Sequence, residues 1–215
     1  MAGNERFFAV ELPNVCMTIE AGVVAVQGDV SEHAAAIRRA ARSHDEEATV
    51  TEIRTAGHVP DCDILLMPGG ESTAISRHLQ REGIAAEIIA HVDAGKPVLA
   101  TCAGLIVAST DANDDRVEPL DLVDVSIERN AFGRQKDSFE APLDVAGLDD
   151  PFPAVFIRAP VIDSVGEAEV LAEWDGRPVA VRDGPVLGTS FHPELTDDHR
   201  IHGLAFFSDV AATTR

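Results

Sequence analysis

The sequence predicts an α/β fold: a mainly parallel central sheet flanked by helices on both faces, with extra antiparallel strands. In the first half, short apolar runs alternate with helical patterns, as expected for parallel strands buried under helices. In the second half, short strands are joined by Asp175-Gly176 and Asp183-Gly184, pairs that favour tight hairpins. The 215 residues contain no internal repeat or linker, so we expect one domain.

The parallel part begins with an apolar strand at residues 19–26. A helix is predicted at 31–43, because Ser31 is a suitable N-cap and Ala34, Ile37 and Ala41 recur at helical spacing. Further apolar runs predict strands at 49–53, 63–67 and 97–101. Further helices are predicted at 73–81, 84–94 and 103–109.

The second half is predicted to be richer in strands. These are expected at 122–129, 154–157, 169–174, 178–182 and 186–191, followed by a final helix at 199–210. Residues 1–16 differ from this pattern, so we predict an N-terminal extension, a domain at 17–215, and Met17 as the natural start. The alternative is an additional edge strand at residues 6–12.

The charge balance is strongly acidic, with 37 Asp and Glu residues against 17 Lys and Arg and a net charge of -20. Such a surface repels nucleic acids and anionic membranes, which excludes them as expected partners. Only two lysines occur, Lys96 and Lys136. We infer a halophilic source, because concentrated salt screens the self-repulsion of such a surface. Stability that did not rise between low and molar salt would contradict this inference.

The three cysteines, Cys16, Cys62 and Cys102, are far apart and include no C-x-x-C pair. This spacing favours neither a zinc site nor a disulfide framework. The chain shows no secretory signal and no apolar run of membrane-spanning length. We therefore expect a cytoplasmic protein without a metal.

Cys102 lies in the stretch Pro97-Val-Leu-Ala-Thr-Cys-Ala-Gly104, where a buried strand is predicted to turn into a helix. A nucleophile at such a turn is held at the carboxyl end of the sheet, and small neighbours leave room for substrate. The following helix N-terminus favours the thiolate. The alternative is an inert buried cysteine.

His192 and Glu194 lie in the stretch Gly188-Thr-Ser-Phe-His-Pro-Glu194, at the end of a predicted strand. Proline after histidine restricts the backbone to extended forms, which would put both side chains on one side. A carboxylate could then orient an imidazole that serves the cysteine. The alternative is an unrelated surface turn; the seven other histidines are assigned no role.

The stretch Pro68-Gly-Gly-Glu-Ser-Thr73 follows another buried strand. Two glycines permit close approach to a ligand, and the backbone N–H groups of Gly70 and Ala103 could form an oxyanion hole. The alternative is a plain loop with Ser72 as N-cap. A phosphate loop is excluded, since its lysine and glycine spacing are absent. All three candidate elements are expected at carboxyl ends of strands, where an open α/β sheet builds its site.

Together these stretches resemble class I (triad) glutamine amidotransferases, and more closely the PdxT family of glutaminase subunits of pyridoxal 5'-phosphate synthase. The resemblance runs from about residue 22 to about 207. Family-specific stretches are Glu128-Arg-Asn-Ala-Phe-Gly-Arg-Gln135 and Phe156-Ile-Arg-Ala-Pro160. Val26-Gln-Gly28, Asp137-Ser-Phe-Glu140 and Ser190-Phe-His-Pro-Glu-Leu-Thr196 add to it.

The resemblance implies roles for individual residues. Cys102 would be the acylated nucleophile, His192 the general base and acid, and Glu194 the orienting carboxylate. The glutamine site would be lined by Gly70, Glu71, Ser72, Arg129, Ile157 and Arg158. Without the resemblance, Arg129 and Arg158 would be interpreted as surface or structural ion-pair residues.

The implied reaction converts L-glutamine and water to L-glutamate and ammonia without a cofactor. The ammonia would pass to a PdxS-type synthase subunit, a (β/α)₈ barrel, within a large hetero-oligomer. Two alternatives remain open: a related amidotransferase that serves another synthase, and a non-catalytic binding module. The family-specific stretches argue against the first, and the intact Cys102, His192 and Glu194 argue against the second.

Overall fold

The computed structural model describes residues 18–128 and 138–208. The predicted extension at 1–16, its alternative strand at 6–12, and Arg129 lie outside the described residues. Within the described part of the chain, no helix is both long and apolar enough to cross a membrane.

A seven-stranded sheet with the order β10-β11-β12-β4-β3-β1-β2 forms the centre of the molecule. The five strands from β12 to β2 are parallel, and β11 and β10 continue the sheet antiparallel. The predicted fold class is therefore confirmed. The strands are β1 (Thr18–Val24), β2 (Glu47–Ile53), β3 (Ile64–Met67), β4 (Val98–Thr101), β10 (Glu169–Trp174), β11 (Arg177–Asp183) and β12 (Val186–Thr189).

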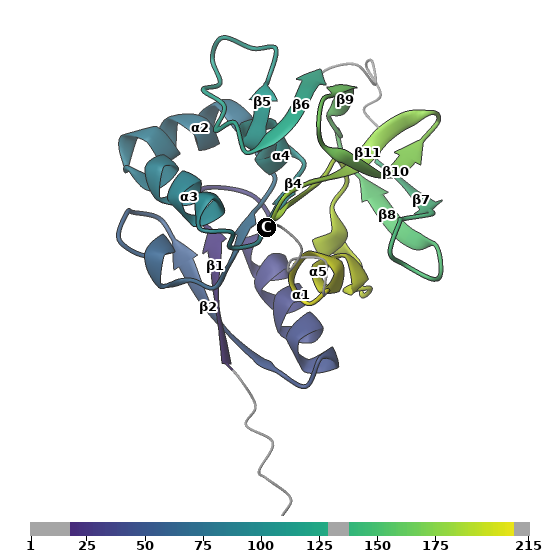
Figure 1. Ribbon diagram of the computed structural model, residues 1–215, viewed down its shortest axis with the longest axis horizontal. Helices are drawn as coiled ribbons and strands as arrows, with labels where there is room; N and C mark the ends of the chain where they lie inside the picture. Colours follow the sequence, from purple (N-terminus) through teal and green to yellow (C-terminus); the bar gives the residue numbers. More distant parts are fainter. Residues whose placement is uncertain (1–17, 129–137, 209–215) are drawn as a thin grey trace, which may run out of the picture.

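Helices cover the two faces of this sheet with separate cores. On one face α1 packs with α5 (Figure 1), and their apolar residues join one buried cluster. On the other face α2 contacts both α3 and α4, whose residues belong to the second cluster. The helices are α1 (Val30–Ser43), α2 (Ser72–Arg81), α3 (Ile84–Asp93), α4 (Ala103–Ala108) and α5 (Arg200–Phe206).

Two small sheets extend the molecule beside the central one. The first joins β5 (Ser109–Asp111), β6 (Val123–Glu128) and β9 (Val161–Val165), and the second pairs β7 (Phe139–Leu143) with β8 (Phe152–Phe156). Sequence reasoning missed β5, β7 and β9. These three segments are short or are interrupted by polar residues and proline. They form strands because they pair with neighbouring strands, not because of their local sequence pattern.

Several boundaries differ from the predicted ones. Asp29, not Ser31, occupies the N-cap of α1, and the Ser31 hydroxyl donates instead to Glu32 at 2.8 Å. Helix α2 begins at Ser72 because the Glu71 carboxylate accepts two backbone N–H groups as its N-cap. The final helix ends at Phe206 rather than extending to 210. Hairpin pairing at Asp175-Gly176 and Asp183-Gly184 is confirmed by the antiparallel β10–β11 and β11–β12 pairs.

Candidate active site

Cys102 is the single residue between β4 and α4, and its backbone is held at φ 50° and ψ −109°. This left-handed region is costly for a residue with a side chain and is typical of strained functional turns. The turn lies so close to β3 that a Cβ on Gly104 would collide with the Met67 backbone oxygen. The Cys102 N–H also donates to the Thr189 carbonyl at 2.8 Å, which ties the turn to β12.

The side chains of His192 and Glu194 meet as the sequence predicted, although the backbone does not stay extended. Residues Pro193–Leu195 form a 3-10 turn, and this turn still brings Glu194 Oε1 to 2.7 Å from His192 Nδ1. The His192 N–H donates to the Val155 carbonyl at 2.8 Å and so anchors the segment to β8.

The imidazole and the thiol belong to one buried group. Cys102 raises the pKa of the neighbouring His192, and the two residues are 6% and 8% exposed, with Glu194 at 3%. A Cβ added to Gly69 would lie 2.8 Å from His192 Cε1 and 3.4 Å from Cys102 Cβ. Glycine is therefore required at 69 for the imidazole to take this place.

Electrostatics favour the charged form of the imidazole. Burial alone lowers the pKa of His192, but the hydrogen bonds and charges of Cys102 and Glu194 outweigh it and raise that pKa to about 10. Burial raises the pKa of Glu194, yet the neighbouring His33 and His192 outweigh it and bring that pKa below its ordinary value. The carboxylate thus stays ionised and stabilises an imidazolium.

A cavity of about 350 Å³ opens beside Cys102. It brings together every predicted site residue that the structure describes except Glu194, which lies behind the imidazole; Arg129 lies outside the described residues. The predicted residues that line it are Gly70, Glu71, Ser72, Cys102, Ala103, Ile157, Arg158 and His192.

Three of the cavity residues differ in what they have available for a ligand. Glu71 is committed to capping α2, where its carboxylate accepts the N–H groups of Thr73 and Ala74. The buried Ser72 hydroxyl finds no hydrogen-bond partner among the described residues. Arg158 is exposed, and its positive φ of 46° means that its backbone is strained where it lines the cavity.

Sequence reasoning missed Asp29 as a residue of this cavity. Its carboxylate lies 4.0 Å from His192 Nδ1. The signal was its position just after the first apolar strand, at the same sheet edge as the other loops.

The ligand atoms of Asp29, His192 and Glu194 lie within 4.8 Å of one another, which raises the question of a metal. The proton on Nδ1, held by the 2.7 Å bond to Glu194 and by the raised pKa of His192, occupies the position that a metal would need. The arrangement therefore fits a hydrogen-bonded triad.

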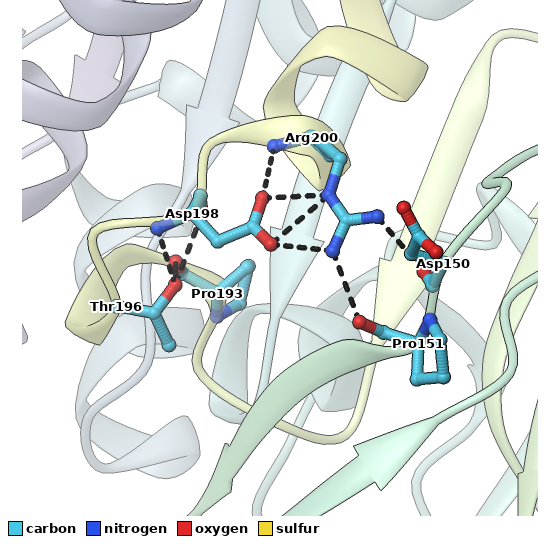
Figure 2. Close-up of polar contacts among 6 residues, drawn as sticks. All are labelled: Asp150, Pro151, Pro193, Thr196, Asp198 and Arg200. Atoms are coloured by element: carbon cyan, nitrogen blue, oxygen red, sulfur yellow. Dashed lines mark hydrogen bonds and ion pairs between the residues drawn. The ribbon is translucent and has the colours of Figure 1, made fainter.

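An arginine clamp fixes the segment that follows Glu194 (Figure 2). The Arg200 guanidinium pairs with Asp198 and donates to the carbonyls of Asp150 and Pro151 at 2.8 and 3.0 Å. Thr196 Oγ1 accepts from the Asp198 N–H and donates to the Asp198 carbonyl. The clamp thus joins the chain after Glu194 to the chain that enters β8 and continues to Arg158.

The comparison with family models completes this picture, because the model of the SNO glutamine amidotransferase family matches residues 23–211. The chain belongs to the SNO glutamine amidotransferase family. Family membership agrees with the predicted resemblance and gives the triad-like geometry a known chemical class.

Curated relatives and a solved structure agree with the family assignment. The chain is 78% identical over 192 residues to "Pyridoxal 5'-phosphate synthase subunit PdxT" of Halobacterium salinarum, covering 89% of this chain and 95% of that protein. It is 75% identical to the protein of the same name from Haloarcula marismortui, covering 90% and 99%. A crystal structure of a glutamine amidotransferase matches with a TM-score of 0.77 and 41% identity, covering 89% and 98%. Both relatives come from halophilic archaea, in agreement with the source inferred from the acidic composition.

Proposed function

We propose that this chain is the glutaminase subunit of a pyridoxal 5'-phosphate synthase, and that Cys102, His192 and Glu194 are its catalytic triad. The observation that carries the proposal is the 2.7 Å contact between His192 Nδ1 and Glu194 Oε1, next to a strained Cys102 that faces a cavity. A nucleophile, a base and an orienting carboxylate in this order are the arrangement of acyl-transfer enzymes.

The reaction proceeds through a thioester. The Cys102 thiolate attacks the side-chain carboxamide carbon of glutamine, and an S–C bond forms while the carbonyl electrons move to oxygen. The intermediate collapses, the C–N bond breaks, and the nitrogen takes the His192 proton and leaves as ammonia. Water then adds to the thioester, gives a proton back to His192, and the C–S bond breaks to release glutamate and the thiolate.

The cavity supplies the remaining functions. The backbone N–H groups of Gly70 and Ala103 stabilise the oxyanion, since both residues line the cavity beside Cys102. Ser72 offers a buried hydroxyl to the substrate. Arg158 binds the α-carboxylate, because an exposed guanidinium can meet a carboxylate in bidentate fashion. Gly70, Glu71, Ile157 and Arg129 complete the proposed glutamine site.

The ammonia passes to a PdxS-type synthase subunit, a (β/α)₈ barrel, in a large hetero-oligomer in the cytoplasm. The printed names of the two haloarchaeal relatives support a synthase partner. The stretches at 128–135 and 156–160 support this partner over the synthase of another amidotransferase. The glutaminase step itself requires no cofactor.

The test is glutamate release from glutamine in high salt, with and without the candidate synthase subunit, for wild type and Cys102→Ala. We expect release that depends on the partner and is abolished in Cys102→Ala. Cys62→Ala is the matched control. Cys62 is also buried, but its thiol donates to the His58 carbonyl and lies outside the cavity lining, so this variant should keep wild-type activity.

Three outcomes would contradict the proposal. Release that persists in Cys102→Ala would remove the nucleophile from the mechanism. No release with this synthase, but release with another synthase subunit, would reassign the partner. Wild type that binds glutamine without hydrolysing it under any pairing would favour a non-catalytic module on this fold.

A further inference from the structure

His33 lies on the buried face of α1 and is fully buried, with an exposed fraction of 0%. It shares this face with Ile37 and Ala40, which pack in the core beneath the sheet. A histidine among these apolar residues is costly unless its ring nitrogens have a use. The ring is directed toward the carboxyl ends of β4 and β12, where the proposed triad sits.

The Nε2 atom of His33 lies between two segments of the site. It hydrogen-bonds Thr101 Oγ1 at 3.2 Å and lies 3.4 Å from Glu194 Oε2, a buried oxygen that has no hydrogen bond among the described residues. Glu194 presents its other oxygen, Oε1, to His192. Thr101 is the residue before Cys102 in the chain, so His33 contacts both the third triad member and the segment that carries the nucleophile.

The charge and tautomer of His33 follow from its surroundings. Burial lowers the pKa of His33 and outweighs the attraction of Glu194, which favours the neutral ring. A neutral ring carries one N–H, and placing it on Nε2 avoids directing a lone pair at the ionised carboxylate. The charged and titratable groups around the ring are Glu194 and His192 from the segment after β12, Asp29 and Glu32 from the start of α1, and His202 from α5, whose ring meets it edge-on.

We propose that His33 is a positioning residue for the triad, whose Nε2–H holds the Glu194 carboxylate against His192 and links it to the Thr101–Cys102 turn. The inference rests on the proposed triad and deepens it. Cys102 follows β4, whereas Glu194 lies in the 3-10 turn after β12. A third element, α1, fixes their relative position through one side chain, and the carboxylate keeps the orientation that supports the imidazolium.

The experiment compares His33→Leu with His33→Gln. Leucine fills the site without a donor, whereas the glutamine amide can place an N–H near the position of Nε2. His33→Leu should lower kcat for glutamate release by about 10- to 100-fold with KM nearly unchanged, as for a small misplacement of a catalytic group. His33→Gln should recover much of that loss. The alkaline limb of the pH profile should move to lower pH in His33→Leu, because a loosened carboxylate supports the His192 proton less well.

The matched control is His91→Leu. His91 is also a buried helical histidine, but it contacts the Pro97 carbonyl on the far side of the sheet from α1. This variant should change thermal stability without moving the pH limb. If His33→Leu does not fold, Thr101→Val removes one of the two contacts of the ring. It should produce a smaller fall in kcat and the same direction of pH shift.

The outcomes separate this inference from the proposed function. Wild-type hydrolysis together with unchanged kcat and pH limb in His33→Leu or Thr101→Val would overturn the role of His33 and leave the glutaminase intact. A loss of kcat in His33→Leu that His33→Gln does not recover, with the alkaline limb of the pH profile unchanged, would show only a structural role for His33. That result would also overturn the inference. If wild type releases no glutamate, iodoacetamide alkylation of Cys102, resolved by peptide mapping, tests the same point: His33→Leu should slow it near neutral pH, and an equal rate would overturn the inference.

Discussion

The two walls of the cavity are built differently. On the triad wall, Cys102, His192 and Glu194 are almost fully buried, and His192 is already hydrogen-bonded to Glu194. Elsewhere in the cavity lining, Glu71 and Arg158 are exposed, and we call this part the recognition wall. Because buried and mutually bonded groups lose little freedom when a substrate binds, the triad wall is preorganised for chemistry. The exposed wall is suited to recognising the charged end of glutamine as it arrives.

The anchors of the triad wall explain its rigidity. Backbone hydrogen bonds tie Cys102 to Thr189 and His192 to Val155, and the strained backbone of Cys102 is maintained only because these neighbours over-determine it. Arg158 is also strained, at φ 46°, but its side chain is exposed. The difference predicts that changes on the triad wall act on kcat and changes on the other wall act on KM.

The largest effect is expected for Glu194→Gln. The amide is isosteric but cannot stabilise the imidazolium, and it no longer fixes the tautomer of His192. We predict a fall in kcat of about 10²- to 10⁴-fold with KM nearly unchanged, measured by glutamate release with the synthase partner. A rise in KM at unchanged kcat would place Glu194 on the recognition wall instead.

The pH dependence of stability should test the raised pKa of His192 on the same triad wall. The folded pKa of His192 is raised to about 10, above its unfolded value, so its stabilising contribution is complete below the unfolded pKa and is lost as pH rises to about 10. Wild type should therefore lose stability relative to His192→Gln across this window, as measured by denaturant unfolding at constant high salt. A difference between the two proteins that stays constant with pH would contradict the raised pKa.

Gly69→Ala tests how closely the triad wall is packed. The added methyl would lie 2.8 Å from His192 Cε1, so the imidazole must shift away from Cys102. We expect kcat to fall by about 10- to 100-fold, the cost of displacing a catalytic group by around 1 Å. Thermal melting checks that the protein still folds; wild-type kcat in a folded variant would show that the ring can move without penalty.

Much of this site could be predicted because the residues follow strands in the chain. Cys102 and the Gly-Gly loop each come directly after a buried apolar run, and such runs reveal where parallel strands end. His33 could not be found this way, because a histidine on a helix shows its role only when folding brings Glu194 beside it. The 3-10 turn at 193–195 was also missed, since proline restricts the preceding residue but does not fix the residues that follow.

On the recognition wall, Arg158→Ala should change KM rather than kcat. Loss of a charge-assisted contact to the α-carboxylate is expected to raise KM by about 10-fold, with kcat within about twofold of wild type. Steady-state glutamate release across glutamine concentrations separates the two constants. A fall in kcat as large as that of Gly69→Ala would mean that the two walls are not energetically distinct.

The smallest effect is expected for Arg200→Gln, which opens the clamp that joins the two walls through the loops at 150–151 and 196–200. The guanidinium donates to two backbone carbonyls besides pairing with Asp198, so its loss should cost about 1–2 kcal/mol and lower Tm by about 2–6 °C. Arg116→Gln is the matched control, because Arg116 pairs with Asp114 in similar geometry but is far more exposed. It should change stability by less than about 0.5 kcal/mol. Equal shifts in both variants would mean that the backbone contacts contribute nothing, whereas a fall in kcat for Arg200→Gln would show that the clamp transmits the position of Glu194 as well as stabilising the loops.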